Sequence, residues 1–230
     1  MIELAVFDIA GTTVDEGGTV YRVLADTVRA AGGDPTPAQI EVWMGASKRT
    51  AIQALLTDSG TGPSDVVVDR AFADFRTRLA GAYRVRPPVP FPGVPEVIAQ
   101  LRAAGVKVAL STGFDRGTTD SLLASIGWTA RILDAVVCID DVTVGRPAPF
   151  MIFHAMEVTG VEDVRRVLVA GDTVRDVQAG RNAGAALVVA VRTGEVPAQT
   201  LAAAGPTHLL DGVADVPRLL TDLGRPIGRA

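Results

Sequence analysis

The chain has 230 residues, 48% of them hydrophobic, and its formal net charge is -4. That length allows one large domain or two small ones, and the charge argues against a general nucleic-acid-binding surface. The sequence shows neither a signal peptide nor an apolar run of membrane-spanning length, and its single cysteine, Cys138, cannot form an internal disulfide. We therefore expect a cytoplasmic protein that binds neither nucleic acid nor membranes.

The first predicted element is a buried strand over residues 4–8, which runs directly into Asp8. Four apolar residues precede the aspartate, and a turn of small residues, 10–13, follows it. A short apolar run bounded by turn residues is typical of a parallel strand covered on both faces. Open α/β sheets bind ligands at the carboxyl ends of their strands, so we expect Asp8 at the mouth of a crevice. Taken alone, the stretch is also compatible with an aspartate that only caps a turn.

Residues 17–88 are predicted to be helical throughout. Helices are expected over 21–31, 35–43, 49–56 and 64–83, from apolar residues that share a helical face and from caps such as Thr36. The pair Gly17-Gly18 begins this segment and a proline-rich stretch, 87–92, spans its end, so a hinge is expected at each end. We interpret 17–88 as a helical cap domain inserted into a core domain made of 1–16 and 89–230.

After residue 92 the pattern changes to a strict alternation of helix and strand. Helices are expected over 94–104, 118–126, 149–158, 174–183 and 213–223. Strands are expected over 107–110, 135–139, 167–170, 186–191 and 208–210. Such alternation produces a parallel sheet with right-handed crossovers. The predicted fold class is therefore α/β, a Rossmann-like core with an inserted helical cap, and the chain is expected to fray after Gly224.

Acidic residues follow the first and fourth core strands. Asp8 ends the first, and Asp172 and Asp176 follow the fourth, so the three carboxylates should converge at one edge of the sheet. Like charges at close quarters are costly unless a cation binds them, and hard oxygen ligands suit Mg2+. One aspartate would then be free to act as a nucleophile on phosphorus. By itself, Asp172 is equally compatible with a helix cap.

Phosphate-binding groups are expected on two neighbouring loops. The second core strand ends at Ser111-Thr112-Gly113, where hydroxyls and backbone N–H groups can hold phosphate oxygens. Arg146, in the loop after the third core strand, would supply fixed positive charge. On its own, Arg146 is also compatible with a surface ion pair.

Together these loops resemble the four motifs of the haloacid dehalogenase superfamily. The matching stretches are residues 8–13 (Asp-Ile-Ala-Gly-Thr-Thr), 111–113 (Ser-Thr-Gly), 145–147 (Gly-Arg-Pro) and 171–176 (Gly-Asp-Thr-Val-Arg-Asp). The resemblance covers essentially the whole chain. It implies a Rossmann-like core, a helical cap inserted after the first motif, Mg2+, and an aspartyl-phosphate intermediate on Asp8.

Residue roles follow from this resemblance. Mg2+ is expected at Asp8, the Ala10 backbone carbonyl and Asp172, with Asp176 in support. The substrate or phosphate-binding residues are expected to be Thr12, Gly45, Ser111, Thr112, Gly113 and Arg146. Related enzymes often pair through their caps, so a homodimer is one expectation for the partner of this chain, beside a small-molecule substrate.

The first motif departs from that of the superfamily's phosphatases at Ala10, where they carry a second aspartate that protonates the leaving group. Alanine cannot transfer a proton. The run Asp-x-Ala-Gly-Thr-Thr is instead similar to that of phosphonoacetaldehyde hydrolases, or phosphonatases, which cleave a carbon–phosphorus bond. Their cap supplies a lysine, within a Met-Gly-x-x-Lys run, that forms a Schiff base with the substrate aldehyde. Here the corresponding run is Met44-Gly45-Ala46-Ser47-Lys48.

The scarcity of lysine points the same way. Of 22 basic residues only Lys48 and Lys107 are lysines, and an arginine would stay protonated and could not form an imine. We expect Met44 to pack beside Lys48, so that desolvation lowers the pKa of the amine. Asp8, Lys48, Ala10 and Met44 are thus the predicted catalytic set, whereas Trp43 is expected to serve in packing only.

Two positions differ from the phosphonatase pattern, and the substrate stays open. Ile9 stands where that family has a bulky aromatic residue, and Ala51 where it has a cap histidine. The predicted function is a Mg2+-dependent phosphonatase-like hydrolase acting on a small carbonyl phosphonate. A phosphomonoesterase acting on a small phosphate ester and a catalytically weak phosphoryl-ligand-binding protein are the alternatives, and Lys48 separates the first interpretation from the second.

Overall fold

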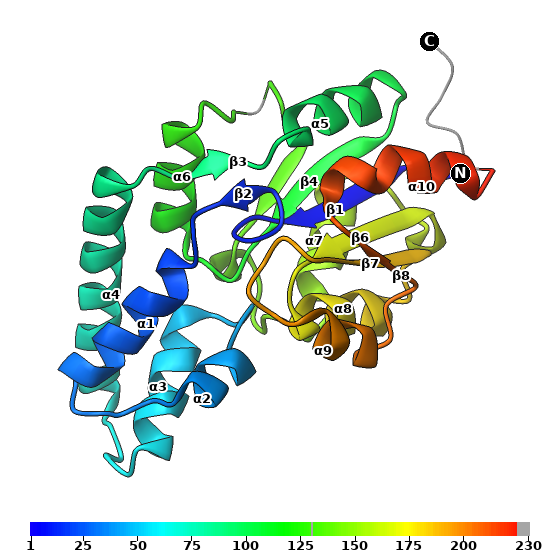
Figure 1. Ribbon diagram of the computed structural model, residues 1–230. Coiled ribbons are helices and arrows are strands. Elements are labelled where there is room, and N and C mark those ends of the chain that lie inside the picture. The colour runs from blue at the N-terminus through cyan, green and yellow to red at the C-terminus, as the bar shows by residue number, and fades with distance from the viewer. Residues whose placement is uncertain (130, 225–230) are drawn as a thin grey trace.

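The computed structural model describes residues 1–129 and 131–224, and its centre is a parallel sheet (Figure 1). The six strands are β1 (Leu4–Asp8), β4 (Lys107–Ser111), β5 (Ala135–Val137), β6 (Val167–Gly171), β7 (Leu187–Val191) and β8 (His208–Leu210). Their order is β5-β4-β1-β6-β7-β8, and every neighbouring pair is parallel. β1 is therefore central, flanked by β4 and β6, which lead into the Ser-Thr-Gly and Gly-Asp-Thr-Val-Arg-Asp motifs. The predicted α/β fold class is confirmed.

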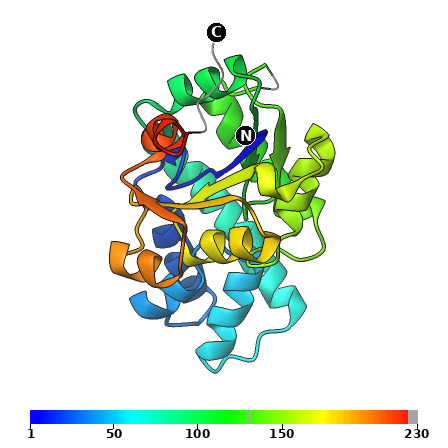
Figure 2. The same cartoon turned by 90° about the vertical axis from the view of Figure 1, so that its right-hand side faces the viewer.

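Helices cover both faces of this sheet (Figures 1 and 2). One face carries α5 (Val94–Ala103), α6 (Arg116–Ser125) and α10 (Val216–Asp222), and the other carries α7 (Phe150–Thr159), α8 (Val174–Ala183) and α9 (Ala198–Ala203). Alternate residues of β1 serve the two layers, because Ala5 and Phe7 join the first apolar cluster and Leu4 and Val6 join the second. Both faces of the strand are buried, which explains its continuous apolar run.

Three core elements differ clearly from their predictions. Helix α10 begins at Val216 rather than at residue 213, because a 3-10 turn covers Val213–Asp215. β5 ends at Val137 rather than at residue 139, because a 3-10 turn covers Ile139–Asp141 and the Asp141 carboxylate accepts a hydrogen bond from the Cys138 N–H. Helix α9 was not expected, since its six residues bury only Leu201 and are too few to show a helical period. The predicted fraying after Gly224 falls outside the described residues.

Between β2 (Val14–Asp15) and β3 (Val89–Pro90) the chain forms four helices. This segment, all of it described, supplies no strand of the six-stranded sheet. The helices are α1 (Thr19–Ala30), α2 (Pro37–Val42), α3 (Lys48–Asp58) and α4 (Asp65–Val85), each within two residues of its predicted bounds. β2 and β3 pair antiparallel, so the chain enters and leaves the helical insertion side by side. The proline-rich stretch, expected only as a linker, thus also supplies one strand of a small ribbon.

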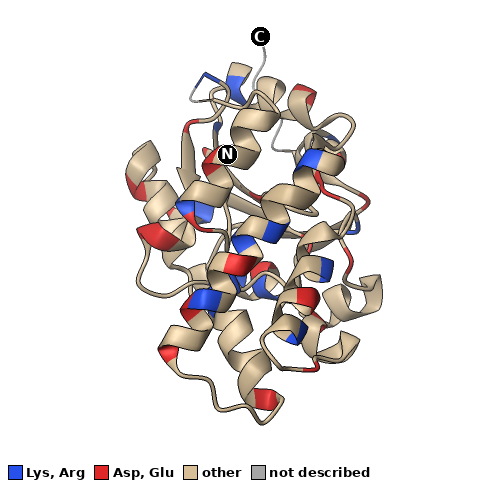
Figure 3. Ribbon diagram, turned by 90° about the vertical axis from the view of Figure 1, so that its left-hand side faces the viewer, with Lys and Arg blue, Asp and Glu red and all other residues tan. Residues whose placement is uncertain are grey.

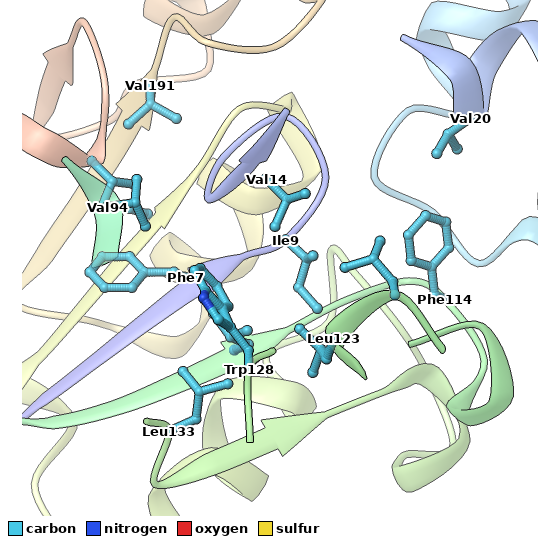
Figure 4. Packing of buried hydrophobic residues seen from close by; sticks show 14 of the residues in the cluster. Phe7, Ile9, Val14, Val20, Val94, Phe114, Leu123, Trp128, Leu133 and Val191 are labelled. Carbon is cyan, nitrogen blue, oxygen red and sulfur yellow. The ribbon is translucent and has the colours of Figure 1, made fainter. Parts of the chain in front are cut away.

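One apolar cluster continues from the sheet into the insertion. Ile9 and Val14 lie against each other, and Val20 of α1 faces Phe114 nearby (Figure 4). Helices α1, α3 and α4 bury residues such as Leu24 and Phe75 in the same cluster. On the outer face, acidic and basic residues are interspersed, and Arg49 pairs with two aspartates of α4 (Figure 3). No helix in the described ranges is apolar over a length that could cross a membrane.

Candidate active site

The carboxyl ends of β1, β4 and β6 bring the predicted motifs together. Asp8 stands in register with Ser111 on the neighbouring strand, and Asp172 directly follows β6 on the other side. A cavity of about 20 Å³ lies here, lined from the core by Asp8, Thr112 and Arg146 and from the insertion by Gly45 and Lys48. Asp8, Arg146 and the predicted cap lysine therefore share one small cavity, whereas the predicted residues Ser111, Asp172 and Asp176 lie beside it and do not line it.

Arg146 is the centre of a buried polar network. Its Nη1 lies 2.6 Å from Asp8 Oδ1 and 2.7 Å from Asp176 Oδ1. Its Nη2 donates to the Ser111 carbonyl oxygen at 2.8 Å and to Ser111 Oγ at 2.6 Å. Charge-assisted bonds of this kind are strong and geometrically specific. Arg146 is thus a buried positive charge at the end of β1. The alternative interpretation, in which it forms an ion pair at the surface, is wrong.

The Asp8 carboxyl carries an unusual pKa. Burial raises the pKa to about 7, the Arg146 charge opposes the shift, and the Asp176 charge adds to it. A carboxylate held among other carboxylates in a desolvated site is costly in its charged form. In this structure the Arg146 guanidinium supplies the positive charge that offsets part of this cost.

Asp172 is wedged between backbone segments. Its Oδ1 accepts a hydrogen bond from Thr12 Oγ1 at 2.6 Å, and a side chain at either Gly11 or Gly194 would clash with its carboxylate. Burial, with the charges of Asp8 and Asp176, raises the pKa of Asp172 well above its usual range. Thr12, expected to bind phosphate, here orients Asp172.

Asp176 has its oxygens engaged by protein groups. Oδ2 accepts bonds from the Thr173 N–H at 3.0 Å and from Thr173 Oγ1 at 2.5 Å, in the capping box that begins α8, while Oδ1 pairs with Arg146. Within residues 1–129 and 131–224, no group of three or more His, Cys, Asp or Glu side chains is arranged as a metal cage. Through Oδ1, Asp176 holds the Arg146 guanidinium in this structure.

Lys48 opens α3 and points into the cavity from the insertion. It is buried, and its Nζ donates to the Ala46 carbonyl oxygen at 2.9 Å. Nζ lies 5.6 Å from the centre of the Tyr21 ring and 5.4 Å from that of Phe114. Burial lowers the pKa of Lys48 to about 8, while the charge of Asp8 opposes the shift. A desolvated amine of this kind is a nucleophile near neutral pH.

The loop 43–47 of the insertion presses against the core loops. A side chain at Gly45, whose φ is +77°, would clash with Thr173 Oγ1, and one at Gly113 would come within 2.7 Å of the Ala46 carbonyl oxygen. Thr112 lines the cavity and its Oγ1 accepts from the Phe114 N–H at 3.2 Å. The predicted residues Gly45, Thr112 and Gly113 thus lie together because backbones approach closely there.

Comparison with known proteins places this geometry in a family. A model of haloacid dehalogenase-like hydrolases matches residues 2–184. The chain belongs to the haloacid dehalogenase-like hydrolases, in the branch related to phosphonoacetaldehyde hydrolase. A protein of that name from Bacillus cereus (strain AH820) is 33% identical over 195 residues, covering 80% of this chain and 73% of the relative, and one from Bacillus anthracis has the same identity and coverage.

Solved structures share the fold of this hydrolase. A phosphonoacetaldehyde hydrolase-like protein from Oleispira antarctica has a TM-score of 0.84 at 24% identity and covers 100% of this chain and 95% of its own. A hydrolase from Pseudomonas syringae has a TM-score of 0.85 at 21% identity, covering 96% and 99%. A β-phosphoglucomutase from Clostridium difficile reaches 0.83 at 15% identity, covering 98% and 97%. At these identities the likeness establishes the fold alone.

The two departures from the phosphonatase pattern have structural explanations. Ile9 is fully buried and packs in the apolar cluster beside Val14, and Ala51 is fully buried in the same cluster. Neither lies on the cavity wall. In this hydrolase both positions serve core packing.

Sequence reasoning missed the residues that surround Lys48. Met44 is partly buried against two apolar clusters and does not line the cavity, whereas Tyr21 and Phe114 do. Phe114 directly follows the Ser-Thr-Gly motif, and this closeness to a motif is a weak hint that it belongs to the site. Tyr21 lies in an ordinary amphipathic helix and carries no such hint. Their convergence depends on how the insertion packs on the core, which no local pattern encodes.

Proposed function

We propose that this protein is a Mg2+-dependent phosphonatase-like hydrolase that cleaves the carbon–phosphorus bond of a small phosphonate bearing a carbonyl group. One observation carries the proposal: Lys48 and Asp8 line the same small cavity. Ala10 also lines it, and its methyl side chain cannot act as an acid. A lysine with a pKa of about 8 is neutral often enough near pH 7 to attack a carbonyl. The relatives named phosphonoacetaldehyde hydrolase support the same substrate class.

Lys48 carries out the bond changes at the carbonyl carbon. Its Nζ adds to the carbonyl carbon and water leaves, which gives a protonated imine. Asp8 then attacks phosphorus, the carbon–phosphorus bond breaks, and its electron pair moves toward the imine nitrogen to give an enamine. Protonation at carbon and hydrolysis return free Lys48 and release the carbonyl product. The imine serves as the electron sink, so no acid is needed at Ala10.

The bond changes at phosphorus are carried out by residues at the strand ends. Asp8 becomes an aspartyl-phosphate, and water hydrolyses it to inorganic phosphate, so that the sum is phosphonate plus water giving a carbonyl compound plus phosphate. Arg146 is placed to bind phosphoryl oxygens because it already lies 2.6 Å from Asp8 Oδ1. Ser111 and Asp176 hold that guanidinium in place.

The donor set fits Mg2+. Asp8 and Asp172 are buried carboxylates, and burial together with the charge of Asp8 raises the pKa of Asp172. Mg2+ usually takes few protein carboxylates and keeps several waters. Asp8, Asp172 and the Ala10 carbonyl oxygen would hold the ion, with Asp176 in support through Arg146. Bound there, Mg2+ supplies charge neutralisation for the phosphoryl group.

Residues 17–88 would act as a movable cap. The cavity of about 20 Å³ has room for little more than one water, which needs roughly 10–15 Å³, so a phosphonate enters only if the insertion moves away. The paired strands β2 and β3 carry both connections, and Gly17 and Gly18 adopt positive φ just before α1. These features support hinges near Gly17-Gly18 and Pro87–Pro90, with closure bringing Lys48 to Asp8.

Reductive trapping tests the proposal. The protein is mixed with phosphonoacetaldehyde and borohydride, and tryptic peptides are examined by mass spectrometry. We expect an adduct on Lys48 and none on Lys107, whose half-exposed side chain is the internal control. Phosphate release is measured in parallel on phosphonates and phosphate esters, with and without Mg2+. Release from esters without a Lys48 adduct would contradict the proposal and favour the phosphomonoesterase alternative.

A further inference from the structure

Arg175 joins the core to the insertion beside the proposed active site. It lies in the first turn of α8, and its guanidinium carbon is 4.9 Å from the centre of the Trp43 ring. Its Nη2 donates to the Val42 carbonyl oxygen at 3.3 Å, and its Nη1 donates to the Arg146 carbonyl oxygen at 3.4 Å. One side chain thus contacts the loop that leads to Lys48 and the loop that presents Arg146.

The stack on Trp43 is the main contact of this guanidinium. Both hydrogen bonds are long, Arg175 forms no ion pair among the described residues, and its Nε is buried without a hydrogen-bond partner there. Guanidinium groups stack favourably on aromatic faces, most of all on tryptophan. Trp43, expected only to pack, is therefore also the platform for a core arginine.

The geometry of the neighbouring loop makes this contact sensitive to closure. The backbone at Gly45 lies against Thr173 and the β-carbon of Arg175, and the Ala46 carbonyl lies against Gly113. These contacts exist only while the insertion is seated on the core. When it opens, Trp43 leaves and the guanidinium becomes solvated, so the stack favours the closed form without preventing opening.

We propose that Arg175 is a positioning residue that holds the Trp43–Lys48 loop on the core by stacking on Trp43. Its effect on turnover, through the placement of Lys48 over Asp8, rests on the function proposed above. The contact itself, here called the clasp, needs only the proposed movement of residues 17–88 and no particular reaction. The strength of such a stack corresponds to a shift of about two- to thirtyfold in the ratio of closed to open molecules.

Fluorescence of Trp43 tests the clasp without any substrate. Trp43 and Trp128 are the two tryptophans of the chain, and a Trp128→Phe background leaves Trp43 as the reporter. We expect acrylamide quenching of Trp43 to rise in Arg175→Met and to rise less in Arg175→Lys, which keeps the charge. Arg165→Met is the matched control, because Arg165 is 84% exposed and pairs with Asp163 before β6, at the far end of the strand.

A second measurement avoids the Trp128 substitution, which removes a buried core side chain. Amide hydrogen exchange over residues 43–48 should be faster in Arg175→Met than in the unsubstituted chain or in Arg165→Met. Unchanged quenching and unchanged exchange in Arg175→Met would overturn the clasp, whatever the activity of the protein.

The rate of imine trapping on Lys48 tests the positioning role. We expect Arg175→Met to lower the trapping rate and kcat by about two- to thirtyfold, with partial rescue by Arg175→Lys. Faster exchange with an unchanged trapping rate would overturn the positioning of Lys48 by Arg175. If the unsubstituted chain yields no adduct at all, the proposed function fails, while the fluorescence and exchange results still decide the clasp.

Discussion

Asp8 at the strand ends is held by the charged side chain of Arg146, whereas Lys48 across the cavity is held by a backbone carbonyl and lies between two aromatic rings. Arg146 fixes Asp8 and is itself fixed by Ser111 and Asp176. Lys48 donates to the Ala46 carbonyl oxygen and faces the rings of Tyr21 and Phe114. The core side of the site is polar, and the insertion side is largely apolar and would reach the core by closure on the proposed hinges.

This difference assigns the two halves of the proposed reaction to the two sides of the site. The network around Asp8 suits phosphoryl transfer, which is catalysed chiefly by positioning and electrostatic stabilisation. The apolar wall around Lys48 suits imine chemistry, because desolvation keeps an amine neutral. Changes on the core side should therefore abolish every phosphorus reaction, and changes on the insertion side should remove carbon–phosphorus cleavage selectively.

The largest effect is expected from Asp8→Asn. The amide keeps the size of the carboxyl but is a poor nucleophile, so turnover of any substrate should fall by about 10⁴-fold or more. Phosphate release measures the loss. Thermal unfolding serves as the control and should show a Tm close to that of the unsubstituted chain, because Asp176 still pairs with Arg146. Residual turnover within tenfold of the original would contradict the role of Asp8 as nucleophile.

The next largest effect is expected from Lys48→Arg, which should affect the insertion side of the site and leave the core side intact. Lys48→Arg keeps a positive charge but cannot form an imine, so cleavage of a carbonyl phosphonate should fall by about 10³-fold while binding of inorganic phosphate is retained. Lys107→Arg is the matched control, since Lys107 is half-exposed at the start of β4, at the opposite end of the strand from Ser111. Calorimetry with phosphate and Mg2+ measures binding. Equal cleavage by both variants would remove Lys48 from the mechanism.

The core side of the site was largely predictable from the sequence. Asp8, Ser111 and Asp172 each end an apolar run, and parallel strands place their carboxyl ends at one edge, so their proximity follows from topology. Ile9 shows where pattern comparison alone was insufficient. It differs from the family residue, and its position in the packed cluster beside Val14 becomes visible only in three dimensions.

The insertion side was predictable in its helices but not in its contacts. The amphipathic pattern gave α1 to α4 within two residues, and the resemblance singled out Lys48. The rings around Lys48, and the stack of Arg175 on Trp43, come from elements distant in sequence that meet only when the insertion packs on the core. Such contacts depend on the relative placement of two folded units, which side-chain periodicity does not record.

A smaller, graded effect is expected from pH. The pKa of Lys48 is lowered to about 8, so the neutral amine fraction should rise tenfold per pH unit below 8 and level off above it. Trapping of the Lys48 imine by cyanoborohydride without Mg2+ should follow this curve. Trapping that continued to rise through pH 10 would contradict the desolvation of Lys48.

The smallest effect tests how closely the insertion must approach the core. Gly45 and Gly60 both have positive φ, at +77° and +78°, but a β-carbon at Gly45 would clash with Thr173 whereas one at Gly60 would meet open space. Gly60→Ala should therefore cost only backbone strain, about 1–2 kcal/mol, seen as a lower Tm with unchanged turnover. Gly45→Ala should lower the Tm by a similar amount and also hold the loop away from Thr173, so that kcat for the carbonyl phosphonate falls several-fold or more. The ratio of the two kcat values isolates closure from strain, because both variants carry the same strain. If the two variants lost equal activity, the polar network at the strand ends would suffice for turnover, and the close approach of the insertion would have no part in it.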